Sequence, residues 1–129
     1  MAEATVRKTR PKHLNVMQIR LPLPGVLSIF HRVSGAGLFL CLPLILFLFG
    51  ASLGTPEQFE TYRAVIANPL VKLVLLGLLW AYLHHFCAGI RFLFMDVHVG
   101  VDLPTARMSA AICFAVSLAL TVIVGVKLW

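Results

Sequence analysis

Three long apolar stretches, joined by short polar segments, dominate the pattern of this chain. None of them contains a lysine, arginine, aspartate or glutamate; the stretches are residues 33–55, 73–90 and 108–126. An α-helix needs about 20 apolar residues to cross the hydrocarbon core of a bilayer. The pattern therefore predicts an all-α membrane protein with three transmembrane helices, at about residues 24–52, 69–95 and 105–128.

The segments outside these helices are polar. An arm of residues 1–23 precedes the membrane domain of residues 24–129, and Pro24 is well placed to open the first helix. We expect residues 50–68 and 91–107 to hold polar loops, because prolines and charged residues gather there between the apolar stretches. Neighbouring helices would then run antiparallel.

Lysine and arginine are distributed unevenly over the polar segments. Five of them stand in the arm before the first helix: Arg7, Lys8, Arg10, Lys12 and Arg20. The first connection holds Arg63 together with Glu57 and Glu60. Because positively charged flanks stay in the cytoplasm, we expect a cytoplasmic N-terminus and, after three crossings, a periplasmic C-terminus. The protein would be a multi-pass protein of the bacterial inner membrane.

The composition agrees with this class. Hydrophobic residues make up 60% of the chain, compared with roughly 45 to 50% in soluble domains. The net charge of +6 arises mostly in the arm, next to a membrane entry point and without interleaved aromatic residues, which argues against nucleic-acid binding. The three cysteines are widely spaced in apolar stretches, so we expect small core residues rather than disulfides or a zinc site.

Two pairs of ionisable residues lie at the edges of different apolar stretches. His31 and Arg32 precede the first stretch, and His84 and His85 lie near the end of the second. Ionisable groups at membrane depth are costly and usually have a partner or a function. Because the two helices run in opposite directions, we expect both pairs to approach the cytoplasmic face and to converge.

Small residues lie one helical turn from these pairs: Ser28, Gly35 and Gly89. Gly37 is a further small residue in the first helix. Such residues let a flat ligand or a second helix approach the backbone closely.

A histidine beside a glycine-lined slot is suited to haem, because neutral imidazole binds haem iron and nearby cations bind the propionates. Either His84 or His85 can be the ligand but not both, since adjacent residues point about 100° apart. His31, Arg32 and Arg91 would then meet the propionates. The alternative is structural: His84 hydrogen-bonds to a neighbouring helix, and Arg32 extends to the lipid headgroups.

Two runs of residues resemble motifs of the cytochrome b subunit of succinate dehydrogenase, a membrane anchor of that complex. The motif S-I-x-H-R-x-[ST]-G resembles Ser28-Ile-Phe-His31-Arg32-Val-Ser34-Gly35. The motif H-x-x-x-G-I-R-H-x-x-x-D resembles His85-Phe-Cys-Ala-Gly89-Ile90-Arg91, followed by Asp96. The family's N-terminal arm is similar to Arg10-Pro11 and His13-Leu14, so the resemblance covers nearly the whole chain.

The chain departs from the family pattern at two places. Phe92 stands where the family usually has a histidine. The segment Asp96-Val-His98-Val-Gly100 stands where the family usually has the shorter sequence Asp-x-Gly. The first departure removes one possible contact to a propionate or to a partner. Neither departure touches the ligand position.

The resemblance implies a role for each matching residue at the haem. His85 would be the axial ligand of the haem b iron. His84 would have a structural role or would support the ligand without binding the iron. His31, Arg32 and Arg91 would contact the propionates.

The resemblance also implies a ubiquinone pocket near the cytoplasmic face, lined by Ser28 and Arg32. Asp96 would pair with Arg91 or Arg32, or else help conduct protons from the cytoplasm. We favour the pairing, which is the simpler of the two roles.

The chain would work only with partners. In the family, a second membrane anchor supplies the other axial histidine, and flavoprotein and iron–sulfur subunits on the cytoplasmic side pass electrons to ubiquinone. This subunit would not be catalytic alone. Two alternatives are a haemless structural anchor of the same complex and a small transporter component, which the lack of an internal repeat or broken helix disfavours.

Overall fold

The computed structural model describes residues 18–129, and this range folds into four α-helices without a strand. The helices are α1 (Leu23–Ser52), α2 (Pro56–Ala67), α3 (Pro69–Asp96) and α4 (Leu103–Leu128). Three of them, α1, α3 and α4, are long and apolar enough to cross a membrane. The predicted fold class, all-α with three spans, is therefore confirmed. Most of the expected arm, including Arg10-Pro11 and His13-Leu14, lies outside the described residues.

Each helix begins where the sequence supplies a proline in the first turn. Proline suits this position because the first backbone N–H groups of a helix have no acceptor within the helix. The side chains of Thr55, Asn68 and Asp102 cap α2, α3 and α4 by accepting a backbone N–H from the first turn. Local sequence signals thus determine where the helices start.

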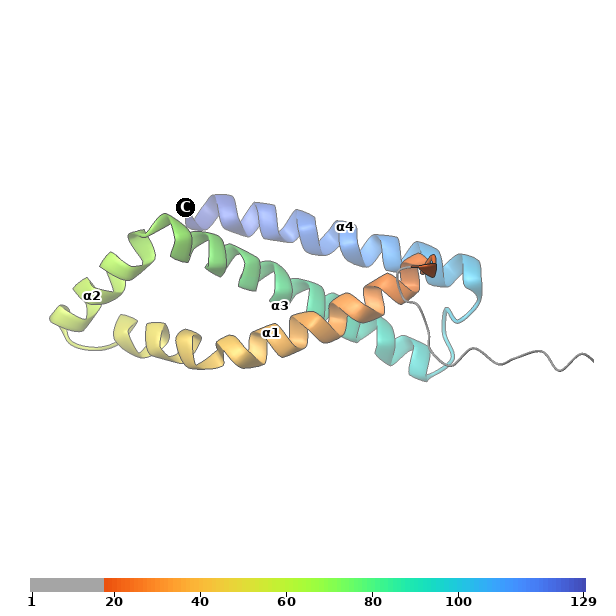
Figure 1. Ribbon diagram of the computed structural model, residues 1–129, viewed down its shortest axis with the longest axis horizontal. Coiled ribbons are helices and arrows are strands. Elements are labelled where there is room, and N and C mark those ends of the chain that lie inside the picture. The colour runs from red at the N-terminus through yellow and green to blue at the C-terminus, as the bar shows by residue number, and fades with distance from the viewer. Residues whose placement is uncertain (1–17) are drawn as a thin grey trace, which may run out of the picture.

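The connection between α1 and α3 differs from the loop that the sequence pattern predicted. It contains helix α2, because Thr55 and Gln58 form a capping box. The Thr55 hydroxyl accepts the Gln58 backbone N–H at 3.4 Å, and the Gln58 side-chain oxygen accepts the Thr55 backbone N–H at 3.0 Å. Helix α2 lies at the end of the bundle where α1 finishes and α3 begins (Figure 1).

Helix α3 packs against both α1 and α4, and α1 and α4 meet less extensively. Figure 1 shows α1 crossing α3, with α4 beside α3. One end of the bundle holds the start of α1, the end of α3 and the start of α4, and we call it the histidine end. The other end holds α2 and the C-terminus (Figure 1). Both sequence motifs therefore lie towards the same end.

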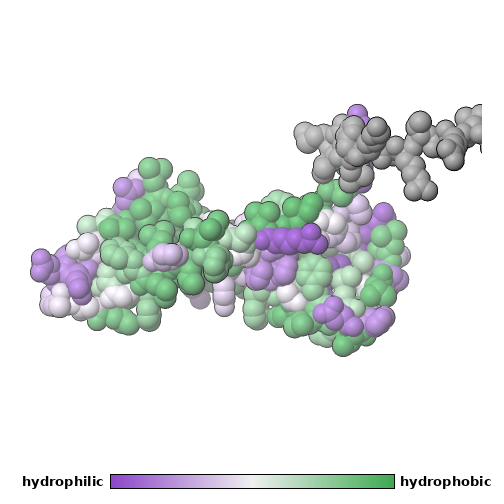
Figure 2. Space-filling view, turned by 60° about the horizontal axis from the view of Figure 1, so that its bottom comes forward, coloured by the Kyte–Doolittle hydropathy of each residue, from purple (hydrophilic) through white to green (hydrophobic). Residues whose placement is uncertain are grey.

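The bundle has a small core and an apolar exterior. The core cluster consists of Leu27, Ala88, Ala110 and Cys113. Among the outward side chains, Phe39 and Leu40 are each 75% exposed. Figure 2 shows apolar residues over most of the visible surface, with polar residues gathered near the ends and in a narrow band. Such a surface suits lipid or other helices, as expected for a multi-pass membrane protein.

Candidate functional site

The two sequence motifs meet where the ring of His31 from α1 stacks on the ring of His85 from α3. The ring centroids are 4.1 Å apart and the planes are 6° from parallel. Phe92, one of the departures from the family pattern, lies on α3 with its ring centroid 5.0 Å from that of His31. The expected convergence of the two ionisable pairs is thus confirmed for His31 of the first pair and His85 of the second.

The ring of His85 is oriented by the backbone of α1. Its Nδ1 lies 2.9 Å from the carbonyl oxygen of His31 and 3.4 Å from the hydroxyl oxygen of Ser34. A carbonyl oxygen only accepts hydrogen bonds, so Nδ1 carries the proton and donates it. With the proton on Nδ1, the tautomer that binds a metal is the one whose lone pair lies on Nε2.

Two of the three glycines near the histidines leave room for a neighbouring ring. A Cβ on Gly35 would lie 2.7 Å from Cε1 of His85, so only glycine allows this approach. A Cβ on Gly89 would lie 3.7 Å from Nε2 of His31, an ordinary contact. Among residues 18–129 nothing lies within 4 Å of a Cβ built on Gly37, so no helix of the described part of the chain approaches it closely.

The adjacent His84 lies in a different environment. It is fully buried, and its ring packs against Trp80 of α3, Phe114 of α4 and Phe30 of α1, with centroid distances of 5.2, 4.9 and 6.1 Å. Neither ring nitrogen has a hydrogen-bond partner in the described residues. The neighbouring helix that the structural interpretation expected is α1, whose Leu27 backbone interacts with the His84 imidazole without reaching full hydrogen-bond geometry. His84 packs as an aromatic residue where three helices meet.

Arg91 faces α4 rather than the stacked histidines. Its Nε donates to the hydroxyl of Ser109 at 2.8 Å, and its Nη2 donates to the carbonyl of Ala106 at 3.2 Å. Arg91 follows His84 by seven residues, almost two full turns, so the two share a face of α3. The structure does not bring Arg91 into contact with His31 or His85 among the interactions of residues 18–129.

The expected ion pair of Asp96, with either Arg91 or Arg32, is not formed among residues 18–129. The one ion pair with a nitrogen–oxygen distance below 4 Å in residues 18–129 joins Arg63 and Glu60 of α2, at 3.4 Å. Asp96 is exposed at the last position of α3. Five residues correspond to about 140° around a helix, so Asp96 and Arg91 point to different sides.

Ser28 and Arg32 lie one turn apart on α1. Ser28 is half-buried and Arg32 is exposed. Because residues four apart share a helix face, the hydroxyl and the guanidinium border the same strip of the bundle surface beside His31.

The connection from α3 to α4 turns through two residues with positive φ, His98 at 63° and Gly100 at 73°. It ends at Asp102, which caps α4. The hydroxyl of Thr105 donates to the Asp102 carboxylate at 2.7 Å, and the Thr105 backbone N–H donates at 3.1 Å. These two hydrogen bonds lower the pKa of Asp102, the hydroxyl having the larger effect.

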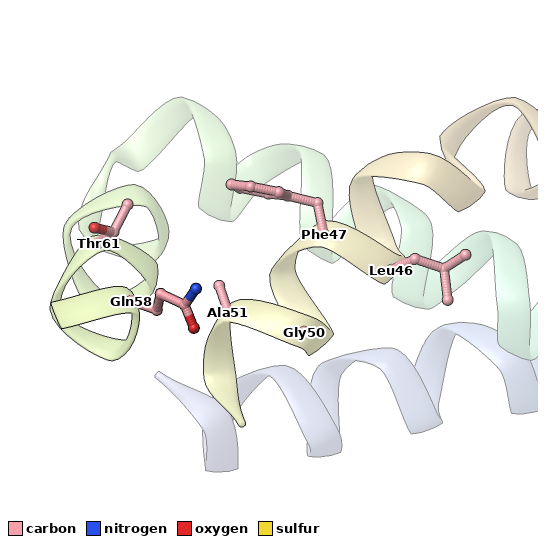
Figure 3. Close-up of a pocket in the computed structure, with 6 residues that line it drawn as sticks. All are labelled: Leu46, Phe47, Gly50, Ala51, Gln58 and Thr61. Atoms are coloured by element: carbon pink, nitrogen blue, oxygen red, sulfur yellow. The ribbon is translucent and has the colours of Figure 1, made fainter. Parts of the chain in front are cut away.

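A pocket at the opposite end of the bundle carries no such chemistry. Figure 3 shows it between the last turns of α1 and the start of α2, with Gln58 and Thr61 facing Ala51 and Phe47. None of its lining side chains is ionisable. This pocket therefore offers no acid, base or metal ligand, unlike the histidine end.

Comparison with known proteins agrees with the arrangement of these residues. Residues 6–124 match the family described as succinate dehydrogenase/fumarate reductase transmembrane subunit. A succinate dehydrogenase cytochrome b556 subunit of Coxiella burnetii is 37% identical over 121 residues, covering 93% of this chain and 97% of that protein. One of Paracoccus denitrificans is 32% identical over 117 residues, covering 91% of this chain and 90% of that protein. The chain therefore belongs to the succinate dehydrogenase/fumarate reductase transmembrane subunit family.

Proposed function

We propose that this protein holds haem b and forms part of the ubiquinone-reduction site of a succinate dehydrogenase complex. One observation carries the proposal: the His31 carbonyl accepts the Nδ1 proton of His85, which leaves Nε2 free to bind iron. The relatives named above are cytochrome b556 subunits, which supports the same assignment.

The residues present fit a haem. His85 is half-buried at an apolar surface, and Gly35 provides the space in which its ring lies. In residues 18–129 no three metal-binding side chains lie together, so this part of the chain offers single histidine ligands rather than a metal cage. A second histidine ligand would come from the other membrane anchor. His84 is a poorer candidate, because aromatic rings enclose it on three helices.

The bound haem would supply one-electron transfer between the iron–sulfur subunit and the quinone. His85 would hold the iron, and the ring of His31, stacked on that of His85, helps fix the orientation of the His85 ring. Arg32, the exposed cation next to His31, is the side chain best placed to meet a propionate at the surface of the bundle. Arg91 is not placed at the propionates in this proposal, because its guanidinium is hydrogen-bonded to α4.

Ser28 and Arg32 act on ubiquinone. Reduction places negative charge on the quinone oxygens before they are protonated, and a hydroxyl and a guanidinium stabilise that charge in a site with little water. The strip formed by these two residues faces away from the core of this chain, where the second anchor would complete the pocket. Asp96, exposed and outside any ion pair among the described residues, is available to deliver protons.

The histidine end faces the cytoplasm in this proposal. The basic residues of the arm favour that orientation, and it places both motifs next to the flavoprotein and iron–sulfur subunits. The protein would then cross the bacterial inner membrane three times, with its C-terminus in the periplasm.

The assembled complex tests the proposal directly. It would be purified with its partner subunits and reduced first with succinate and then with dithionite. We expect b-type bands in the reduced-minus-oxidised spectrum. An assembled complex without these bands that still reduces quinone would leave the chain as a haemless structural anchor.

A further inference from the structure

A positive charge is buried near the histidine end, and residues 18–129 supply no counter-ion for it. Arg91 is 6% exposed. Its Nε and Nη2 bind Ser109 and Ala106, but Nη1 has no hydrogen-bond partner in the described residues. Neither acceptor is an anion, and no ion pair of Arg91 lies within 4 Å in residues 18–129. A buried guanidinium in this state is costly, so an anion from outside residues 18–129 would stabilise it.

Arg91 lines a pocket of about 320 Å³ between α3, α4 and their connection. Thr105 and Ser109 contribute hydroxyl groups, and most of the other lining side chains are apolar. Four of these apolar residues are between 41% and 58% exposed: Ile90, Phe94, Val99 and Ile112. The pocket therefore opens sideways through the apolar exterior of the bundle, towards the lipid.

The depth of the pocket matches the boundary between lipid headgroups and acyl chains. Arg91 lies five residues before the end of α3, which corresponds to about 7.5 Å along the helix. The pocket extends from Gly100 in the connection to Cys113 on α4. Basic pockets between transmembrane helices at this level bind anionic headgroups.

We propose that this pocket binds an anionic phospholipid. A phosphodiester oxygen accepts a charge-assisted hydrogen bond from the Arg91 guanidinium when the side chains that enclose Nη1 move aside. An acyl chain follows the apolar wall towards Ile112. A carboxylate from a partner protein would satisfy the cation but would leave the apolar part of the pocket to another occupant. One phospholipid satisfies both parts.

The lipid site is separate from the proposed haem ligand. Arg91 and His85 are six residues apart, which corresponds to about 120° around α3. Arg91 binds α4, whereas His85 binds α1. Loss of lipid at Arg91 is therefore expected without loss of haem.

The test uses the intact complex, purified, delipidated and titrated with dioleoylphosphatidylglycerol under native mass spectrometry. Arg91→Gln should bind one lipid fewer, or bind it at least about tenfold more weakly, because a hydrogen bond to a charged group is lost. Arg107→Gln is the matched control, since Arg107 is an exposed arginine at the same end of the bundle. It should bind lipid as the unmodified complex does. Ile112→Trp keeps Arg91 but fills the pocket from its exposed rim, and it should also lose the lipid.

Inorganic phosphate distinguishes a lipid from a small anion. At millimolar concentration it should not displace the phospholipid, because it cannot use the apolar wall. Displacement by phosphate would overturn the lipid assignment. Equal lipid binding by the unmodified complex and Arg91→Gln would also overturn it, and loss of a subunit together with unchanged lipid binding would identify a protein carboxylate instead. Where Arg91→Gln does not assemble, unchanged lipid binding by Ile112→Trp would contradict the proposal.

Discussion

The backbone of Gly35 and the imidazole of His85 occupy adjoining space between α1 and α3. A Cβ on Gly35 would lie 2.7 Å from Cε1 of His85 and 3.1 Å from its Nδ1. The same ring donates to the carbonyl of His31, one turn earlier on α1. The position of the proposed haem ligand therefore depends on the absence of a side chain on the facing helix.

Gly35→Ala is expected to displace the ring of His85 and to lower the haem content of the assembled complex. Overpacking of a close contact typically costs about 1 to 3 kcal/mol, so we expect a lower melting temperature as well. The measurement is the haem-to-protein ratio with the difference spectrum of the purified complex.

Gly37→Ala is the matched control, because the added methyl group meets nothing within 4 Å among residues 18–129. It lies two residues away on the same helix and removes the same glycine flexibility. A loss of haem equal to that of Gly35→Ala would show that the contact with His85 is not the cause.

Ser28→Ala and Arg32→Leu are expected to slow ubiquinone reduction while sparing succinate oxidation by an artificial acceptor that takes electrons from the soluble subunits. Loss of a donor to a developing oxyanion typically costs about 2.7 to 4 kcal/mol, which is a hundredfold or more in rate. Both rates would be measured on the same preparations.

Arg32 needs a separate control, because the same guanidinium is proposed to meet a haem propionate. Haem content would therefore be measured beside the activity of each variant. Assembled, haem-replete variants with unchanged quinone reductase rates would remove both residues from the quinone site, and Arg32 would remain an arginine that reaches the headgroups.

The orientation of the bundle is testable with reporter fusions. A reporter after Glu60, on α2, should read as periplasmic, and one after Asp102, at the start of α4, should read as cytoplasmic. The opposite readings would place the histidine end away from the cytoplasmic subunits and would contradict the shared site.

The sequence predicted the three spans because their signal is strong and local. Apolar stretches of this length form transmembrane helices. A proline in the first turn marks the start of each helix. Helix α2 was missed because it is short and polar. Its signal was present in Thr55 and Gln58, which have the spacing of a capping box.

The side-chain partners were harder to predict than the helices. That Asp96 and Arg91 point to different sides follows from their spacing, so the wrong pairing was avoidable. The hydrogen bond from Arg91 to Ser109 could not be predicted from the sequence, because the register of α3 against α4 depends on packing between residues far apart in sequence. For the same reason, spacing alone left His84 and His85 equivalent. The resemblance to the family motif favoured His85, and the structure adds that the two rings lie in different surroundings.

The most direct test applies one substitution to both adjacent histidines. His85→Phe keeps an aromatic ring against His31 but removes Nε2, and His84→Phe keeps the aromatic packing with Trp80 and Phe114. In complexes purified with all partners, we expect His85→Phe to lose or strongly perturb the b-type spectrum and His84→Phe to retain it. A normal spectrum in His85→Phe, together with its loss in His84→Phe, would contradict the assignment of the haem ligand.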